Sequence, residues 1–523
     1  MHSVTLWIVF FTFAVATLAL AMYGIHLYVL LCLFRRRVYS RRAAQRAIIH
    51  SYGLRPGDVP WPVVTSQIPI FNESDVSRRV MESVAAMDYP QGRHEIQVLD
   101  DSTDGTEQIV DAVAARLVSQ GIDIKVVRRP SRDGYKAGAL AHGLASARGS
   151  YVAIFDADFV PPREFLRKAI PLLEDAPDLA CMQGRWDHLN RSESWLTEAQ
   201  ALGIDGHFAI EQGARAWNGL LMNFNGTAGV WRKAAIEDPS VGGWNGDTLT
   251  EDLDLSYRAQ LAGWRLDYCL DMPCPAELPS TVNALKSQQR RWATGSIQVA
   301  CKLLPRIWRA PLSLGQKVEA TLHLTHYSVA LWMLLLALVA RPMLLAFADG
   351  RILSSDWFWL AWALILLSAV APSVTYTYAR YSLGGGFSGV KIIPYMFVVG
   401  CGLCLNNAIA VVRGLYLRGG EFVRTPKSGS TDTASRASNY QVVRSQMWLV
   451  ELGLGVYSGA TFVVCFQDYH RAFSFFLLIY AISFLVIGWR SRPQRSPAPA
   501  IQSEKLSGML PADTVPVESP SSG

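Results

Sequence analysis

One apolar run near the N-terminus constrains this 523-residue chain most, because it places part of the protein in a membrane. The run from Thr5 to Phe34 holds no Asp, Glu, Lys or Arg and exceeds the roughly 20 residues that a helix needs to cross a bilayer. Arginines follow it at once, which predicts a cytoplasmic location for the next residues. A cleaved signal peptide would have a basic start and a shorter apolar core. We therefore predict a retained signal-anchor helix over residues 1–37.

Apolar segments return in a C-terminal membrane region, residues 317–489, and account for a hydrophobic content of 50%. Four of these segments predict transmembrane helices, at about residues 320–347, 357–378, 447–466 and 473–489. Together with the N-terminal helix they give a multi-pass protein with five spans.

A further apolar segment, residues 392–412, is less simple to assign. It is long enough to span, but Asn406 and Asn407 lie near its middle, where polar groups are costly in lipid. The loop 413–446 and the tail 490–523 both carry arginines, which predicts that both are cytoplasmic. We therefore expect residues 392–412 to lie along the interface or to re-enter, with a sixth span as the alternative. The tail is rich in Pro and Ser, and we expect it to be disordered.

Residues 38–316 are polar and mixed, with alternating strand-like and helix-like runs that predict a cytoplasmic α/β domain. An apolar run from Tyr151 to Phe155 leads into Asp156 and Asp158. Ionised carboxylates are costly to bury without a partner, yet they suit a divalent cation that also bridges a diphosphate. Since no His or Cys cluster lies nearby, Mg²⁺ or Mn²⁺ is favoured. The pattern predicts a nucleotide and metal site at the carboxyl edge of a sheet.

Three other segments offer groups that suit a nucleotide. Phe71 and Glu73 follow the first predicted strand, and Phe71 could stack on a nucleobase. Asp100 and Asp101 end the second strand, where either could accept hydrogen bonds from base or ribose; an Asx-turn is the alternative. Lys136 lies in a glycine-punctuated loop that opens a helix, where phosphate can bind, although the spacing is not that of a Walker A loop. A solvated lysine is the alternative.

Two motifs near the end of the polar region offer a candidate general base and a candidate phosphate-binding group. Glu251 and Asp252 follow Thr250 at a predicted helix start. In one interpretation Thr250 caps the helix and the two acids only stabilise its positively charged first turn. In the other, one of the two carboxylates takes a proton from an attacking sugar hydroxyl. Arg291 offers bidentate donors to phosphate and Trp292 a flat face to a sugar ring. A basic and aromatic belt at the membrane surface is the alternative.

The net charge of +6 fits basic residues that face anionic lipid. Basic and aromatic residues are not interleaved as in a strand-binding groove, so we expect membrane lipid as a partner and no nucleic acid. The eight cysteines have no zinc-type spacing, and the CxxC at Cys401 and Cys404 lies in an apolar segment, which predicts packing.

These motifs, in this order, resemble the family 2 processive glycosyltransferases, and most closely the cellulose synthase-like A and C type. The resemblance rests on residues 67–73, 96–104, 134–140, 152–159, 224–232 and 277–281 and on the motif Gln288-x-x-Arg291-Trp292. It implies a GT-A (Rossmann-like) domain between transmembrane helices. The implied enzyme is an inverting, metal-dependent hexosyltransferase. It would move sugar from GDP-mannose or UDP-glucose to a growing β-1,4-linked polysaccharide, a mannan, glucomannan or glucan, and translocate that polymer.

The resemblance also implies roles for individual residues. Asp100 or Asp101 would contact the nucleoside, and Lys136 and Arg291 the diphosphate. The metal and nucleotide would meet Asp156 and Asp158, with Asp252 next to Glu251 as the base. Trp292 would stack on the acceptor, whose site is lined by Phe224, Asn225, Gly226 and Thr227. A gating loop would contain Phe422, Arg424, Thr425 and Lys427, although Arg424 and Pro426 depart from the family form.

Two other functions remain open at this point. A single addition to a lipid acceptor would use the same chemistry, and a catalytically inactive membrane scaffold would use none. The several spans after residue 316 and the Gln288-x-x-Arg291-Trp292 motif favour the polymerase, while the occupied acidic positions disfavour the scaffold. The sequence predicts a location in a bacterial inner membrane or its equivalent and identifies no export partner.

Overall fold

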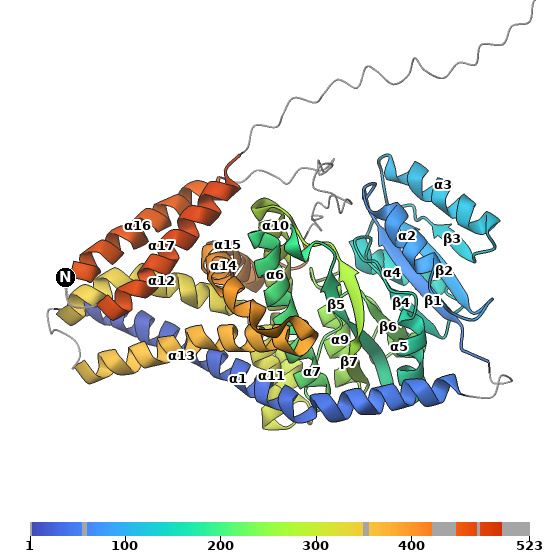
Figure 1. Cartoon of the computed structure of the whole chain (residues 1–523), viewed down its shortest axis with the longest axis horizontal. Helices are drawn as coiled ribbons and strands as arrows, with labels where there is room; N and C mark the ends of the chain where they lie inside the picture. Colours follow the sequence, from blue (N-terminus) through green and yellow to red (C-terminus); the bar gives the residue numbers. More distant parts are fainter. Residues whose placement is uncertain (1–2, 55–59, 349–354, 421–445, 468–470, 494–523) are drawn as a thin grey trace, which may run out of the picture. The chain divides into compact units, whose positions relative to one another are not determined.

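The computed structural model describes residues 3–54, 60–348, 355–420, 446–467 and 471–493 (Figure 1). Residues Met1–Ser491 form one compact unit, so the polar α/β region and the apolar helices pack as one body. The predicted gating residues Phe422, Arg424, Thr425 and Lys427 lie outside the described residues.

A seven-stranded mixed sheet is the centre of the polar region, in the order β3-β2-β1-β4-β6-β5-β7. Its strands are β1 Val64–Ile70, β2 His94–Asp100, β3 Ile124–Val127, β4 Tyr151–Ile154, β5 Leu179–His188, β6 Gly229–Arg232 and β7 Arg265–Ala276. Only β6 runs antiparallel to its neighbours, β4 and β5. The parallel strands β1, β2 and β4 therefore end at one edge, where α/β sheets bind ligands. This strand order is that of the GT-A fold, so the predicted fold class is confirmed.

Helices cover both faces of the sheet, which explains the continuous apolar runs of its strands. One core contains residues of α2 (Ser77–Ala85), α3 (Thr106–Ser119) and α5 (Phe165–Glu174). The other core contains residues of α4 (Tyr135–Ala145), η2 (Gly206–Glu211), α7 (Gln212–Ala216) and α9 (Glu251–Leu261). Between β5 and β6 the chain also forms η1 (Arg191–Glu193) and α6 (Trp195–Asp205), and α8 (Lys233–Ile236) follows β6.

The N-terminal helix α1 (Ser3–Gly53) is longer than predicted. It does not end at residue 37 but continues through the arginines for 51 residues in all (Figure 1). Arg41 pairs with Asp267 at 2.7 Å, and Arg42 pairs with Asp271 at 2.6 Å, both on β7. Arg46 also pairs with Asp271. These basic residues therefore bind the sheet, and lipid attraction alone does not explain them.

The C-terminal region consists of further helices. These are α10 (Val282–Arg309), α11 (Leu314–Leu324), α12 (Ser328–Ala348), α13 (Ser355–Arg380), η3 (Tyr381–Gly385), η4 (Gly386–Ser388), α14 (Gly389–Gly402), α15 (Cys404–Tyr416), α16 (Met447–Gln467) and α17 (Arg471–Ser491). Among the described residues, four helical stretches are long and apolar enough to cross a membrane, or five if α11 and α12, bent by 65°, count as one span. The predicted span 320–347 thus contains a bend. Which stretches cross remains a prediction.

Residues 392–412 are broken at Leu403 into α14 and α15. The buried Asn406 is not exposed to lipid, because its Nδ2 donates to the carbonyl of Lys286 at 3.1 Å and its Oδ1 accepts from Arg290 at 2.9 Å. Both partners lie on α10, so α15 packs on the helix that carries Arg291 and Trp292. These contacts give the polar side chain partners that lipid would not supply, and the re-entrant or interfacial position of the segment stays a prediction.

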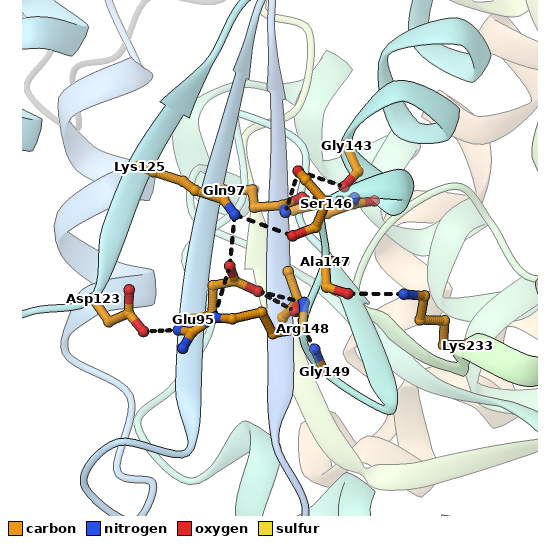
Figure 2. Close-up of polar contacts among 12 residues, drawn as sticks. Glu95, Gln97, Asp123, Lys125, Gly143, Ser146, Ala147, Arg148, Gly149 and Lys233 are labelled. Atoms are coloured by element: carbon orange, nitrogen blue, oxygen red, sulfur yellow. Dashed lines mark hydrogen bonds and ion pairs between the residues drawn. The ribbon is translucent and has the colours of Figure 1, made fainter.

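A buried glutamate organises the amino-terminal edge of the sheet (Figure 2). Glu95 on β2 accepts hydrogen bonds from Thr65 at 2.6 Å and from the backbone N–H of Arg148 at 2.9 Å, and it pairs with Lys125 at 2.8 Å. Burial alone would raise the pKa of this carboxyl, but the bonds from Lys125, Thr65 and Arg148 outweigh it and hold the pKa at about 2. The network ties β1, β2 and β3 to the turn before β4, and thereby fixes the strands whose other ends form the ligand edge.

We expect Glu95→Gln to destabilise the protein by about 1–3 kcal/mol, because a neutral amide cannot satisfy the same donors. The measurement is the thermal unfolding midpoint in detergent, with Glu237→Gln on an exposed ion pair as control. The depressed pKa stabilises the fold above the usual glutamate pKa, and this contribution is lost as the pH falls toward 2. The difference from wild type should therefore shrink below about pH 4. Equal midpoints at neutral pH would contradict this role.

Candidate active site

A cavity of about 160 Å³ opens at the carboxyl ends of the central strands. Most of the predicted site residues line it. They are Phe71, Glu73, Asp101, Lys136, Asp156, Asp158, Asn225, Gly226, Glu251, Asp252, Arg291 and Trp292. These residues come from segments more than 200 positions apart, so the fold brings the separate motifs into one site.

Four carboxylates gather around one lysine in this cavity. Lys136, in the first turn of α4, lies 2.5 Å from Asp156 Oδ1 and donates to the carbonyl of Gly226 at 2.9 Å. The same ammonium lies 3.9 Å from Glu251 Oε1. Asp158 and Asp252 line the cavity as well. Lys136 and Arg291, which also lines the cavity, supply two positive charges against these four carboxylates, so the site has an excess of negative charge that suits a divalent cation.

No group of three or more His, Cys, Asp and Glu side chains among the described residues could hold a metal ion by itself. Asp156 and Asp158 could supply two oxygen ligands and leave the other positions to phosphate and water, as Mg²⁺ sites commonly do. Burial raises the pKa of Asp156, while the charge of Lys136 lowers it. The donor set therefore fits a cation that arrives with a diphosphate.

The best candidate for a base is Asp252, in the first turn of α9. Burial, followed by the charge of Glu251, raises the pKa of Asp252 to about 7, while Lys136 and Arg291 act in the opposite direction. A carboxylate with such a pKa can take up a proton near neutral pH. Thr250 stands at the N-cap position, but its side chain makes no capping hydrogen bond, so the predicted capping role is not observed.

Gly226 keeps this centre compact. Its φ of +79° lies in the left-handed region, and a Cβ there would lie 2.9 Å from Asp252 Oδ2 and 3.3 Å from Lys136 Nζ. A side chain at this position would push the lysine and the base apart and would strain the backbone, so glycine suits it best. The neighbouring Thr227 accepts a hydrogen bond from the backbone N–H of Asp156 at 2.9 Å and so supports the turn that carries the two aspartates.

Among the residues predicted to bind the nucleotide, Asp100 does not line the cavity. Asp101 lines the cavity and pairs with Arg129 at 2.6 Å. Asp100 is buried, pairs with Arg128 at 2.8 Å and is absent from the cavity wall. Of the two alternatives, only Asp101 thus reaches the site. Arg132, which sequence reasoning missed, lines the cavity, and its guanidinium lies 3.2 Å from the centre of the Phe71 ring.

The predicted acceptor residues also separate into two groups. Asn225 and Gly226 line the cavity. Phe224 is fully buried, packs edge-on against Trp231 and belongs to the core, and Thr227 is buried too. The structure adds Trp186 and His188 of β5, which the sequence analysis did not identify.

Comparison with known proteins places these residues in a family. The profile described as "Glycosyltransferase like family 2" matches residues 62–295. Glucomannan 4-β-mannosyltransferase 2 of Arabidopsis thaliana is 43% identical over 257 residues, which are 48% of this chain and 48% of that protein. Glucomannan 4-β-mannosyltransferase 7 of the same plant is 32% identical over 445 residues, 83% of this chain and 77% of that protein. The chain belongs to glycosyltransferase family 2.

The recognition made from the motifs is thereby confirmed, and so is the enzyme class, a glycosyltransferase. With the first of these relatives, the chain matches about half of that protein's length. Among solved structures, a mannosyltransferase from Pyrobaculum calidifontis in complex with GDP-Man and Mn²⁺ is 21% identical, with a TM-score of 0.44, and the match covers 75% of this chain and 99% of that one. That likeness is too distant to bear on the chemistry. The long apolar helices make this family 2 enzyme a membrane protein.

Proposed function

We propose that this family 2 glycosyltransferase moves a hexose from a nucleoside diphosphate sugar to the end of a β-1,4-linked polysaccharide. Mannose from GDP-mannose is the donor we favour, because the relatives in the comparison are named glucomannan 4-β-mannosyltransferases; UDP-glucose is the alternative. The arginines after the first apolar run support a cytoplasmic catalytic domain. The polymer would leave through the enzyme's own membrane segments.

The observation that carries this proposal is the joint position of Lys136, Asp156 and Asp252 in one cavity. An ammonium group, a pair of carboxylates after β4 and a carboxylate with a pKa of about 7 are the groups that a single displacement at a sugar phosphate requires. A protein that only binds the sugar nucleotide would not need a carboxylate with a pKa of about 7.

The reaction is one in-line displacement. Asp252 takes the proton of an acceptor hydroxyl, whose oxygen attacks the anomeric carbon from the side opposite the diphosphate. The bond between that carbon and the phosphate oxygen breaks, and the diphosphate leaves with the electron pair, so the configuration inverts. Lys136 and Arg291 hold the diphosphate, and the cavity wall orients donor and acceptor. Asp156 and Asp158 would hold Mg²⁺ or Mn²⁺, which when bound offsets the negative charge of the leaving group.

A base with a raised pKa predicts a pH dependence. Asp252 is protonated, and cannot act as a base, below its pKa of about 7. We therefore expect kcat/KM to rise about tenfold for each pH unit below that value and to level off above it. Nucleotide release measured over this range at constant ionic strength tests the expectation. A profile that is flat or falls with pH would remove Asp252 from this role.

The purified protein in detergent provides the test of the function. It is offered GDP-mannose, GDP-glucose, UDP-glucose and UDP-GlcNAc separately with Mg²⁺ or Mn²⁺. We expect nucleotide release from GDP-mannose and a polymer that a β-mannanase degrades. A product extracted into organic solvent with one sugar attached would replace the polymerase with a lipid transferase. No release from any donor would overturn the proposal.

A further inference from the structure

The cavity extends beyond the reaction centre. Lys136, Asp156 and Asp101 lie at the ends of β4 and β2 or next to them, whereas Trp186 and His188 lie on β5, separated from β4 by β6. We propose that Trp186 and His188, together with Trp292, form a subsite that binds the hydroxyls of one pyranose ring of the acceptor chain. This inference deepens the proposed function and rests on it.

His188 is held in place by a buried carboxylate. Its side chain is 1% exposed and lines the cavity, and its Nε2 lies 3.1 Å from Asp205 Oδ1. Asp205 is buried and also accepts a bond from Arg191 at 2.6 Å. An ionised carboxylate can only accept, so His188 Nε2 donates to Asp205, and Nδ1 is left for another partner. Within the described part of the chain, this buried Nδ1 has no hydrogen-bond partner.

Trp186 supplies an N–H donor. Its ring stacks on Phe208 with centroids 4.9 Å apart and meets Phe159 edge-on at 5.1 Å, so its position is fixed. Trp292 lies 6.2 Å away at an angle of 56°. The Trp186 Nε1–H is buried and has no acceptor among the residues that the structure describes. Buried indole N–H groups usually have a partner, so a ligand hydroxyl is the natural candidate.

The two groups lie on one face of the same strand. Residues 186 and 188 are two positions apart on a strand, so their side chains lie on the same face, about 7 Å apart along the chain. Trp186 offers an indole N–H and His188 a ring nitrogen, both without a partner among the described residues, and a hydroxyl group, which can donate or accept, can pair with each of them. A wall with two such groups and an aromatic ring binds a polyol, whereas a diphosphate would need cations there.

The position in the fold favours the acceptor over the donor. Asp205, which orients His188, is the last residue of α6, and α6 packs against α13 and α14. Both of these helices belong to the apolar stretch Trp359–Gly402, which is long enough to cross a membrane. The β5 end of the cavity is therefore the end nearer to the helices through which a polymer would leave.

The test uses the full-length protein in detergent and mannohexaose as the acceptor. Trp186→Phe removes the N–H but keeps an aromatic ring, and His188→Leu removes the Nδ1 nitrogen. We expect each to weaken mannohexaose binding, measured by calorimetry, and to raise its KM about five- to tenfold, the effect of one lost hydrogen bond. The KM for the nucleotide sugar and its hydrolysis without acceptor should stay within about twofold. His188→Gln, which restores a polar group, should recover most of the affinity.

Trp308→Phe and His142→Gln, which change exposed residues away from the cavity, are the matched controls. If His188→Leu fails to fold, Trp186→Phe decides alone. Unchanged mannohexaose affinity in Trp186→Phe, or an equal loss of donor affinity, overturns the subsite. Calorimetry distinguishes a failure of the subsite from a failure of the proposed function. If the wild type binds mannohexaose but releases no nucleotide, the subsite proposal stands and the transferase proposal is wrong.

Discussion

Asp252→Asn should reduce kcat by about 10²–10⁴-fold, the usual contribution of a general base. The amide has nearly the same shape as the carboxylate but cannot take a proton from the attacking hydroxyl. The backbone bond from Leu253 to Asp252 Oδ1, 2.8 Å long, can still form, so the first turn of α9 should persist. Nucleotide release under saturating donor and acceptor measures the loss.

Two comparisons separate chemistry from folding in this variant. Asp247→Asn, an exposed carboxylate in the loop before α9, should leave the rate within about twofold, the change expected at a surface site. Binding of the nucleotide sugar by Asp252→Asn should match that of the wild type. An Asp252→Asn protein with full activity would falsify the assignment and direct attention to Glu251, which lies in the same cavity.

Asp156→Asn and Asp158→Asn should each lower activity about 10³-fold, because a divalent cation contributes several kcal/mol to charge stabilisation at a leaving group. The wild type should lose its activity in EDTA and recover it with Mn²⁺ or Mg²⁺. In the variants the metal concentration for half-maximal activity should rise beyond the range that restores the wild type. Activity as a function of metal concentration measures both effects.

Asp88→Asn is the control for these variants, because that carboxylate pairs with Arg167 on the surface. EDTA-treated wild type with full activity would show that the excess negative charge around Lys136 serves another purpose. A variant whose activity falls at every metal concentration, without a change in metal dependence, would instead assign the lost carboxylate to binding of the substrate.

The centre of the site could be predicted because its groups are adjacent in the sequence. Asp156 and Asp158 lie directly after a buried strand, and Glu251 and Asp252 lie in one helical turn, so local structure alone presents each pair. The order of apolar and polar runs likewise predicted the α/β class, since buried parallel strands require continuous apolar sequence.

The errors arose where a distant partner decides the position of a side chain. Asp100 and Asp101 are equivalent in sequence, but Arg128 holds the first in the interior and leaves the second at the cavity. Phe224 was predicted to contact sugar and is instead packed on Trp231. Trp186 and His188 end a strand whose pairing with β7 connects residues almost 90 positions apart, and no local pattern marks them.

The pairing of α1 with β7 has a mechanical consequence. A helix of 51 residues is about 75 Å long, and its arginines anchor its second half to the aspartates of the sheet. Over the described residues 3–53 the helix continues without a break through the predicted boundary at residue 37. The second half of α1 is therefore fixed directly to the sheet that carries the reaction centre. A fragment that starts after residue 54 would lack helix α1 and would leave Asp267 and Asp271 without the arginines that pair with them. We therefore do not expect such a fragment to be a soluble catalytic domain.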